Sequence, residues 1–286
     1  MDRKREGILA IIGASMMWAV EPVFAKLSFH NSDFVHTSAI RAFVVAAIAL
    51  AYMLLKKASP RVTKKDFSVL LYLGLVGTLF ADLLYFFAMT QIPVLNAVLI
   101  GHMQPIFIVL IGFLILREDK LTKFDYAGIS LMMLSGLMVT TRTLDNLAAL
   151  KFGSMGDLMV LAATMAWATA AIAVRKYLRN LHSSVITFYR FIIASIFFAV
   201  YLSMTSGIVI KNVYQIMVGI AVGIGTILYY EGLKRIKAAQ VSALELSSPL
   251  FAAVIAFFVL GEMFTVMQIA GMLLLFLGVY YLSKKE

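Results

Sequence analysis

Two short stretches decide the fold of this chain: GASMMWA at residues 13–19 and AATMAWA at residues 162–168. They contain the only two tryptophans of the chain, Trp18 and Trp167, which stand 149 residues apart. Two such similar segments around a residue that occurs only twice indicate an internal repeat, because chance would seldom produce this match.

Further matches extend the repeat along both halves. At the same offset Arg41 corresponds to Arg190, although arginine is rare within apolar sequence, and Gly74 corresponds to Gly223. Further along the chain the offset between equivalent residues shortens by five, to 144. The matches there are Tyr85 with Tyr229, Pro105 with Pro249, and Glu118 with Glu262.

The composition is that of a membrane protein. Of the 286 residues, 62% are hydrophobic and 14% are charged, and the mean hydropathy is +0.93. Apolar runs of roughly 20 residues are long enough to cross a bilayer as helices, whereas barrel strands are about half as long and alternate in polarity. The sequence therefore predicts an all-α integral membrane protein with ten transmembrane helices. The expected spans are 8–28, 35–55, 67–89, 94–116, 124–141, 157–175, 185–205, 212–232, 239–260 and 265–282.

The distribution of positive charge predicts the topology. With a cytoplasmic N-terminus, 19 of the 25 lysines and arginines fall in cytoplasmic segments and only three, Arg142, Lys151 and Lys211, on the opposite side. This asymmetry is the positive-inside rule, and it places both termini in the cytoplasm. The net charge of +10 then needs no nucleic-acid partner to explain it.

The repeat divides the chain into residues 1–143 and 150–286, each with five expected spans. Because five is odd, the second half enters the membrane in the opposite orientation, which makes the repeat inverted. Inverted repeats provide two near-equivalent arrangements, open to opposite sides, with a site between them. The alternative is that the duplication merely builds a stable bundle.

The stretch WAVEP places an acid and a proline inside the first apolar run. Pro22 cannot donate a hydrogen bond to the carbonyl of Trp18, and Glu21 lies about one turn from Trp18 on the same helix face. Such a polar and bendable spot is tolerated where protein or water supplies partners. The expected hinges are Pro22, Pro105 and Pro249.

Four acids lie within expected spans, and an ionisable residue there is a functional candidate because its burial is costly. They are Glu21, Asp82, Glu231 and Glu245. Each has an architectural alternative, which is ion pairing with Lys26, Arg41 or Arg190. The arginines in turn either pair across the bundle or bind a substrate anion, and Glu231 lies within reach of Lys234 and Arg235.

Aromatic and imidazole groups complete the expected site. Tyr85 and Tyr229 can stack on a solute or anchor at the interface, and His102 is a relay, a ligand contact or a structural residue. The expected substrate-binding residues are Trp18, Glu21, Tyr85, His102, Trp167, Tyr229 and Glu245. The expected coupling or charge network is Asp82, Arg41, Arg190 and Glu231.

Together these motifs resemble the EamA branch of the drug/metabolite transporter superfamily. The similarity rests on the G…WA pair of each half, the early arginine of each second helix, the tyrosine of each third helix, and the proline followed 13 residues later by glutamate. It implies secondary transport, frequently outward, of small metabolites such as amino acids. It also implies a central cavity bordered by the first, third, fourth, sixth, eighth and ninth helices.

Other function classes find less support. The chain lacks GxxxxGK[ST], HExxH and GxSxG motifs and contains no cysteine, so we expect no catalytic residues, no metal site and no cofactor. A membrane-embedded enzyme is the second function class, and a channel or scaffold is the third. Within transport, an acidic cavity favours amines, cationic drugs or zwitterions, and one governed by the arginines favours organic anions or sugar nucleotides. The resemblance favours amino acids and related small metabolites. The expected partners are a small-molecule substrate and the bilayer of the plasma membrane, with a homodimer left open.

Overall fold

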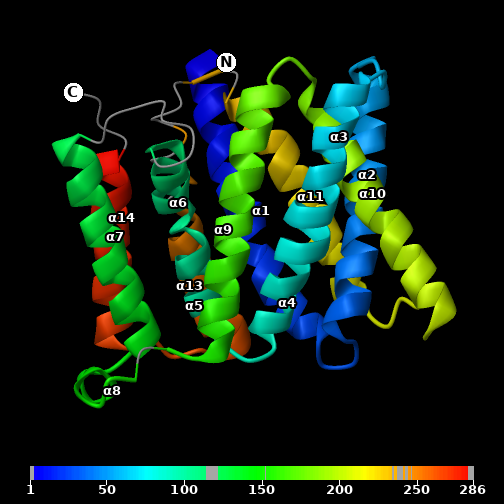
Figure 1. Ribbon diagram of the computed structural model, residues 1–286. Helices are drawn as coiled ribbons and strands as arrows, with labels where there is room; N and C mark the ends of the chain where they lie inside the picture. Colours follow the sequence, from blue (N-terminus) through cyan, green and yellow to red (C-terminus); the bar gives the residue numbers. More distant parts are fainter. Residues whose placement is uncertain are drawn as a thin grey trace.

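The computed structural model describes residues 3–113, 122–151, 153–233, 235–236, 241, 244–245 and 247–282. Within these residues every regular element is a helix, which confirms the predicted fold class (Figure 1). Glu118, which closes the first-half motif, lies outside the described residues.

The helices follow the apolar runs closely. They are α1 (Arg3–Ser28), α2 (Phe34–Leu55), α3 (Lys64–Tyr72), the π-helix η1 (Leu73–Asp82), α4 (Leu83–Met89), α5 (Val94–Gly101), α6 (Gln104–Ile111), α7 (Lys123–Thr141), α8 (Leu144–Ala148), α9 (Met155–Tyr177), α10 (Ser183–Met204), α11 (Val213–Leu233), α13 (Ser247–Leu260) and α14 (Val266–Leu282).

Eight segments of the described chain are long and apolar enough to cross a membrane. Two of them combine several elements, since α3, η1 and α4 form one segment, Lys64–Met89, and α5 and α6 form another, Val94–Ile111. The shorter apolar helices α13 and α14 stand where the last two spans are expected. Large apolar side chains on the outer surface, such as Val200, Met204 and Phe258, are more than half exposed, as lipid contact requires. The chain is therefore a multi-pass membrane protein.

The helices lie roughly side by side, and α1 begins at the end of the bundle where α14 finishes (Figure 1). The short helix α8, which links α7 to α9, lies at the opposite end. α7 and α14 pack against each other at one side of the bundle, and α2 and α10 pack against each other at the other side.

The packing of one half has a counterpart in the other. α1 of the first half packs on α11 of the second, and α9 of the second half packs on η1 and α4 of the first. In the same way α1 contacts α13 while α9 contacts α5. Each of these contacts joins a helix of one half to a helix of the other.

Two glycines show this correspondence at atomic detail. A Cβ added at Gly74 would lie 2.9 Å from Cβ of Ile193 and 3.2 Å from the carbonyl oxygen of Arg190. A Cβ added at Gly219 would lie 2.5 Å from Cβ of Val44 and 3.1 Å from the carbonyl oxygen of Arg41. Because Val44 and Ile193 are themselves 149 residues apart, the contacts pair Gly74 with Gly219. The sequence match of Gly74 with Gly223 is therefore wrong by one helical turn.

The π-helix η1 accounts for the last one-residue change of the offset between the halves. Gly74 and Gly219 are 145 residues apart, whereas Tyr85 and Tyr229 are 144 apart. The first half thus has one extra residue between these positions. A π-helix accommodates one extra residue within a helix, and η1 lies between Gly74 and Tyr85, where the second half has the uninterrupted helix α11.

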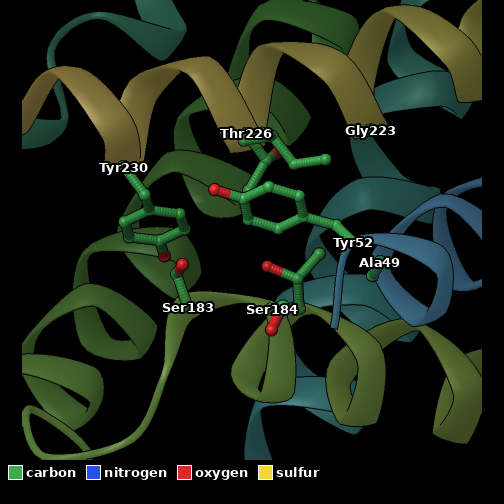
Figure 2. A pocket seen from close by; sticks show the side chains of 9 residues that line it. Ala49, Tyr52, Ser183, Ser184, Gly223, Thr226 and Tyr230 are labelled. Atoms are coloured by element: carbon green, nitrogen blue, oxygen red, sulfur yellow. The ribbon is translucent and has the colours of Figure 1, made fainter. Parts of the chain in front are cut away.

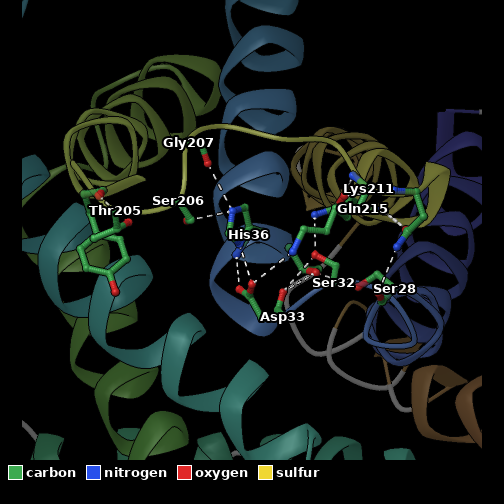
Figure 3. Close-up of polar contacts among 12 residues, drawn as sticks. Ser28, Ser32, Asp33, His36, Thr205, Ser206, Gly207, Lys211 and Gln215 are labelled. Atoms are coloured by element: carbon green, nitrogen blue, oxygen red, sulfur yellow. Dashed lines mark hydrogen bonds and ion pairs between the residues drawn. The ribbon is translucent and has the colours of Figure 1, made fainter. Parts of the chain in front are cut away.

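A polar cluster fixes the turn between α1 and α2 (Figure 3). Asp33 caps α2, because its Oδ1 accepts a hydrogen bond of 2.8 Å from the backbone N–H of His36. Its Oδ2 lies 2.6 Å from Nδ1 of His36 and 3.9 Å from Nζ of Lys211. Nε2 of His36 contacts Ser206 and Gly207 in the segment between α10 and α11, so the cluster ties two turns together.

We expect Gly219→Ala to destabilise the protein by about 1–3 kcal/mol, because the added methyl group overlaps Val44 on the facing helix. The measurement is the melting temperature of the purified protein. Gly112→Ala is the matched control, since a Cβ at Gly112 meets no atom within 4 Å. Equal melting temperatures for the two variants would contradict the close packing of α2 on α11.

We expect Asp33→Asn to lower the melting temperature at pH 7 but much less at pH 3. Burial acts to raise the pKa of Asp33, but hydrogen bonds from the backbone and side chain of His36 outweigh it and hold that pKa below its ordinary value. A lowered pKa contributes stability above the unfolded-state pKa of about 3.9, and this stability is lost as the pH falls through the folded-state value. Asparagine keeps the helix cap, so the comparison isolates the charge. If the melting temperatures of the Asp33→Asn variant and the unmodified protein differ as much at pH 3 as at pH 7, this account is refuted.

Candidate functional site

Asp82, the last residue of η1, is the centre of the largest buried charge cluster in the described structure. Its Oδ2 accepts a hydrogen bond of 2.8 Å from Nη1 of Arg41 on α2. Its Oδ1 accepts hydrogen bonds from Nη2 of Arg190 on α10, at 3.2 Å, and from Nε1 of Trp167 on α9, at 2.7 Å. The Asp82 side chain is only 3% exposed, so these donors replace the water that a carboxylate would otherwise require.

Glu21 extends this cluster. Its Oε1 lies 3.0 Å from Nε of Arg41, in an ion pair whose N–H bond is not aligned as in a hydrogen bond. Glu21, Arg41, Asp82 and Arg190 therefore form a row of alternating charges, which we call the charge chain. Its formal charges sum to zero, which is the condition under which several charges can share a site of low dielectric constant.

The π-helix supplies further partners to the charge chain. Nε of Arg190 donates to Oγ1 of Thr78 at 2.8 Å, and Nη2 of Arg190 donates to the carbonyl oxygen of Gly77 at 3.0 Å. The indole of Trp167 donates to the same carbonyl at 3.2 Å. Gly77 and Thr78 were not among the sequence-predicted residues. The sequence contained one indication of Thr78, because Thr78 precedes Asp82 by four residues and therefore lies on the same helix face.

The two arginines of the charge chain occupy equivalent positions in the two halves, but its two acids have no acidic equivalent in the second half. The position equivalent to Glu21 in the second half is Ala170, and the position equivalent to Asp82 is Thr226. Arg190 therefore reaches across to the acid of the first half. This arrangement makes the charge chain a link between the two halves.

The predicted aromatic residues form two matching pairs. The ring centroids of Trp167 and Tyr85 are 5.1 Å apart, and those of Trp18 and Tyr229 are 5.2 Å apart. Each pair joins a tryptophan of one half to the tyrosine of the other. Since Trp18 corresponds to Trp167 and Tyr85 to Tyr229, one pair is the counterpart of the other.

Two further predicted residues lie outside the charge chain. Glu245 is half-buried, and none of the described basic side chains forms an ion pair with it. His102 stands at the break between α5 and α6, where its Nδ1 lies 2.8 Å from the carbonyl oxygen of Val98. That contact is the structural use of histidine considered from the sequence.

Glu231 belongs to a separate cluster at the end of α11. Its carboxylate lies 2.6 Å from Nη1 of Arg235 and accepts a hydrogen bond from the hydroxyl of Tyr52, while Arg235 also pairs with Glu6 at 3.6 Å. The expected proximity of Glu231 to Arg235 is confirmed, whereas its membership of the coupling network stays a prediction.

The three prolines occupy different local structures. α1 continues without interruption through Pro22. Pro105 stands in the first turn of α6, directly after the break that separates α5 from α6, and Pro249 lies within α13. Proline is well accommodated in a first turn, where its missing N–H would have no helical partner. Their role as hinges stays a prediction.

Sequence reasoning missed a second buried polar cluster. The amide of Asn96 on α5 donates to Oδ1 of Asp157 on α9 at 2.9 Å, and the amide of Gln268 on α14 donates to Oδ1 of Asn96 at 2.7 Å. Nearby, Glu262 accepts from the backbone N–H of Val94 at 2.8 Å and pairs with Lys26 at 3.3 Å. These contacts involve single polar residues within apolar runs, and they join helices at the end of the bundle where α5 begins.

A small cavity of about 10 Å³ lies between α2, α10 and α11. Figure 2 shows the hydroxyl-bearing side chains of Tyr52, Ser183, Ser184, Thr226 and Tyr230 around it. A cavity of this volume has room for about one water molecule. Its wall includes Tyr52, which binds Glu231, and Thr226, the counterpart of Asp82.

We expect Arg41→Gln to destabilise the protein by about 3–5 kcal/mol, because it leaves two buried carboxylates without their shared cation. The melting temperature of the purified variant is the measurement. Arg61→Gln, which removes the same charge at an exposed position, should change stability by less than about 0.5 kcal/mol. Equal melting temperatures for the Arg41→Gln and Arg61→Gln variants would show that the charge chain is not a buried structural unit.

Comparison with known proteins agrees with this architecture. The model of the EamA-like transporter family matches residues 5–141 and again residues 154–284. A crystal structure of a protein shares the fold, with a TM-score of 0.68 at 18% sequence identity over 97% of this chain and 96% of that one.

Curated relatives carry transporter names. An uncharacterized transporter of Methanothermobacter thermautotrophicus is 26% identical over 98% of this chain and 87% of its own length. The uncharacterized inner membrane transporter YhbE of Escherichia coli K12 is 27% identical over 86% and 78%, and the pseudopaline exporter CntI of Pseudomonas aeruginosa is 25% identical over 68% and 66%. The chain therefore belongs to the EamA-like transporter family, whose members are membrane transporters and not enzymes.

Proposed function

We propose that the protein is a secondary transporter that exports small amino-acid-like metabolites by alternating access. The observation that carries this proposal is the charge chain. It is buried, it contains both signs of charge, and it connects the two halves whose relative movement alternating access requires.

The two-repeat organisation is part of the proposal. We infer ten membrane helices in two inverted repeats, residues 1–143 and 150–286, with both termini in the cytoplasm. The matching tryptophan–tyrosine pairs, the equivalent contacts of Gly74 and Gly219, and the two separate matches to the family model support this inference. The positive-inside distribution of lysine and arginine supports the orientation.

The composition of the charge chain favours a zwitterionic substrate. A substrate amine can replace Arg41 as the partner of Glu21, while a substrate carboxylate can replace Asp82 as the partner of Arg190. Such an exchange preserves the neutrality of the buried site. A purely cationic or purely anionic solute would leave one chain member uncompensated, which is costly at this burial.

The substrate-binding residues of the proposal surround this chain. Glu21 and Arg190 are 14% and 28% exposed in their side chains, so they are the members most accessible to a solute, whereas Arg41 and Asp82 are 7% and 3% exposed. Trp167 and Tyr85 on one side, and Trp18, Tyr229 and Glu245 on the other, supply stacking and polar surfaces. The outward direction is supported by the relative that is named as an exporter.

We expect a thermal-shift screen to find saturable stabilisation by amino acids or related zwitterions, and we expect Glu21→Gln and Arg190→Gln to abolish it. A ligand at 100 times its Kd stabilises the folded state by about 2.7 kcal/mol, which is a measurable shift in melting temperature. Glu6→Gln is the matched control, because it is the same substitution on the same helix outside the charge chain. The hit is then tested for saturable, uphill flux in proteoliposomes.

The other outcomes separate the alternatives. Stabilisation only by amines or cationic drugs would replace the zwitterion with a cationic substrate, and stabilisation only by sugar nucleotides or organic anions would replace it with an anion. Binding that survives both substitutions would move the site to Glu245 and Tyr229. Flux that does not saturate would indicate a channel and overturn the transport mechanism.

A further inference from the structure

A groove of about 350 Å³ lies between α3 and α9, away from the charge chain. It is found at the end of the bundle where α3 begins and α9 finishes, which is also the end where α1 begins (Figure 1). Its lining includes Ser68, Tyr72, Thr169, Ile172, Ala173 and Lys176. We refer to it as the α3/α9 groove.

The groove continues the lipid-facing stripe of α9. Leu158 and Met165, which are 57% and 47% exposed, lie two heptads and one heptad before Ile172 and therefore on the same helix face. Lys176 follows Ile172 by one turn on that face. The α3/α9 groove is thus open to the bilayer surface of the protein.

The opposite half of the molecule shows why the groove is open. Ala173 corresponds to Phe24 at the offset of 149, and Val69 corresponds to Tyr214 at the offset of 145. The rings of Phe24 and Tyr214 stack with their centroids 6.2 Å apart and fill the equivalent position between α1 and α11. Small side chains in place of two aromatic rings leave the α3/α9 groove empty of protein.

The polar groups of the groove are also confined to this half. The hydroxyls of Tyr72 and Thr169 are bonded across it at 2.6 Å. The counterparts of the polar lining are apolar: they are Val213 for Ser68, Met217 for Tyr72, Val20 for Thr169 and Leu27 for Lys176. Repetition of the fold alone would not place hydroxyl and ammonium groups here.

Two ammonium groups stand at the mouth of the groove. Nζ of Lys176 and Nζ of Lys65 lie 5.8 Å and 5.9 Å from the centroid of the same ring, that of Tyr177. The nearby carboxylate of Asp66 is engaged in the capping box of Thr63 at the start of α3. Two cations beside one ring of the groove lining, with an apolar wall beneath them, match a phosphodiester that carries acyl chains.

We propose that the α3/α9 groove binds one anionic phospholipid. The phosphate pairs with Lys65 and Lys176, and an acyl chain runs along Ile172 and Ala173. This site is independent of the substrate proposed above, because none of these residues belongs to the charge chain.

Native mass spectrometry of the purified protein, titrated with phosphatidylglycerol or phosphatidylcholine of identical acyl chains, tests the proposal. We expect one tightly bound phosphatidylglycerol, with an affinity about tenfold above that for phosphatidylcholine. Lys65→Gln combined with Lys176→Gln should reduce this preference to near unity. The variant Val69→Tyr with Ala173→Phe, which introduces the ring pair of the opposite half, should remove the bound lipid.

Lys56→Gln combined with Lys57→Gln is the matched control, since it removes two lysines at the same end of the bundle and Lys56 also lies over a tyrosine ring, that of Tyr52, at 5.6 Å. Equal loss of preference in this control would show general surface attraction and overturn the proposal. Displacement of the lipid by millimolar inorganic phosphate would also overturn it in favour of a free-anion site. If the aromatic variant does not fold, the lysine pair and its control still decide the outcome.

Discussion

The structure depends on one buried carboxylate. Asp82 is shared by Arg41 and Arg190, which come from equivalent helices of the two halves, and it is almost completely removed from solvent. Loss of either arginine would leave unbalanced charge at low dielectric constant, so the helices that carry these three residues are held together by electrostatics as well as by packing. Glu21 then becomes necessary, because two arginines and one aspartate would leave the centre with an uncompensated positive charge.

Two departures from symmetry, the π-helix and the unrepeated acids, occur around this carboxylate. The halves agree in their glycine contacts and their tryptophan–tyrosine pairs, but only the first half contains the π-helix, and the π-helix ends at Asp82. The extra residue rotates the helix beyond it, and Gly77 within it offers a carbonyl oxygen to both Arg190 and Trp167. An asymmetric centre within a symmetric frame means that the two conformations of an alternating-access cycle need not have equal energy.

Much of the fold could be predicted from the sequence because hydropathy and bilayer thickness determine where helices begin and end. The first eight expected spans coincide with observed segments, and the arginines and Asp82 were recognised as a charge network. The partners within that network could not be predicted, because they depend on the rotation of each helix about its own axis. The one-turn error at Gly223 arises in the connection that precedes α3, because the offset is 149 at Val44 and already 145 at Gly74. The π-helix that follows leaves no distinct pattern in apolar sequence. Gly77 and Thr78 gain their roles only through that irregular backbone.

The same centre explains why substrate binding and conformational change can be one event. In the observed state Glu21 and Arg190, the two terminal members of the charge chain, are satisfied by protein partners, and their greater exposure places them where a solute can compete. A solute that carries both an amine and a carboxylate can substitute for internal partners without changing the net charge of the site. It would thereby loosen the contacts through which Arg41 on α2 and Arg190 on α10 are both attached to Asp82. The contact of Arg190 with Asp82 connects the two halves, so a solute that replaces it changes the relative energies of the two proposed arrangements, which is the only way in which a ligand can shift a conformational equilibrium.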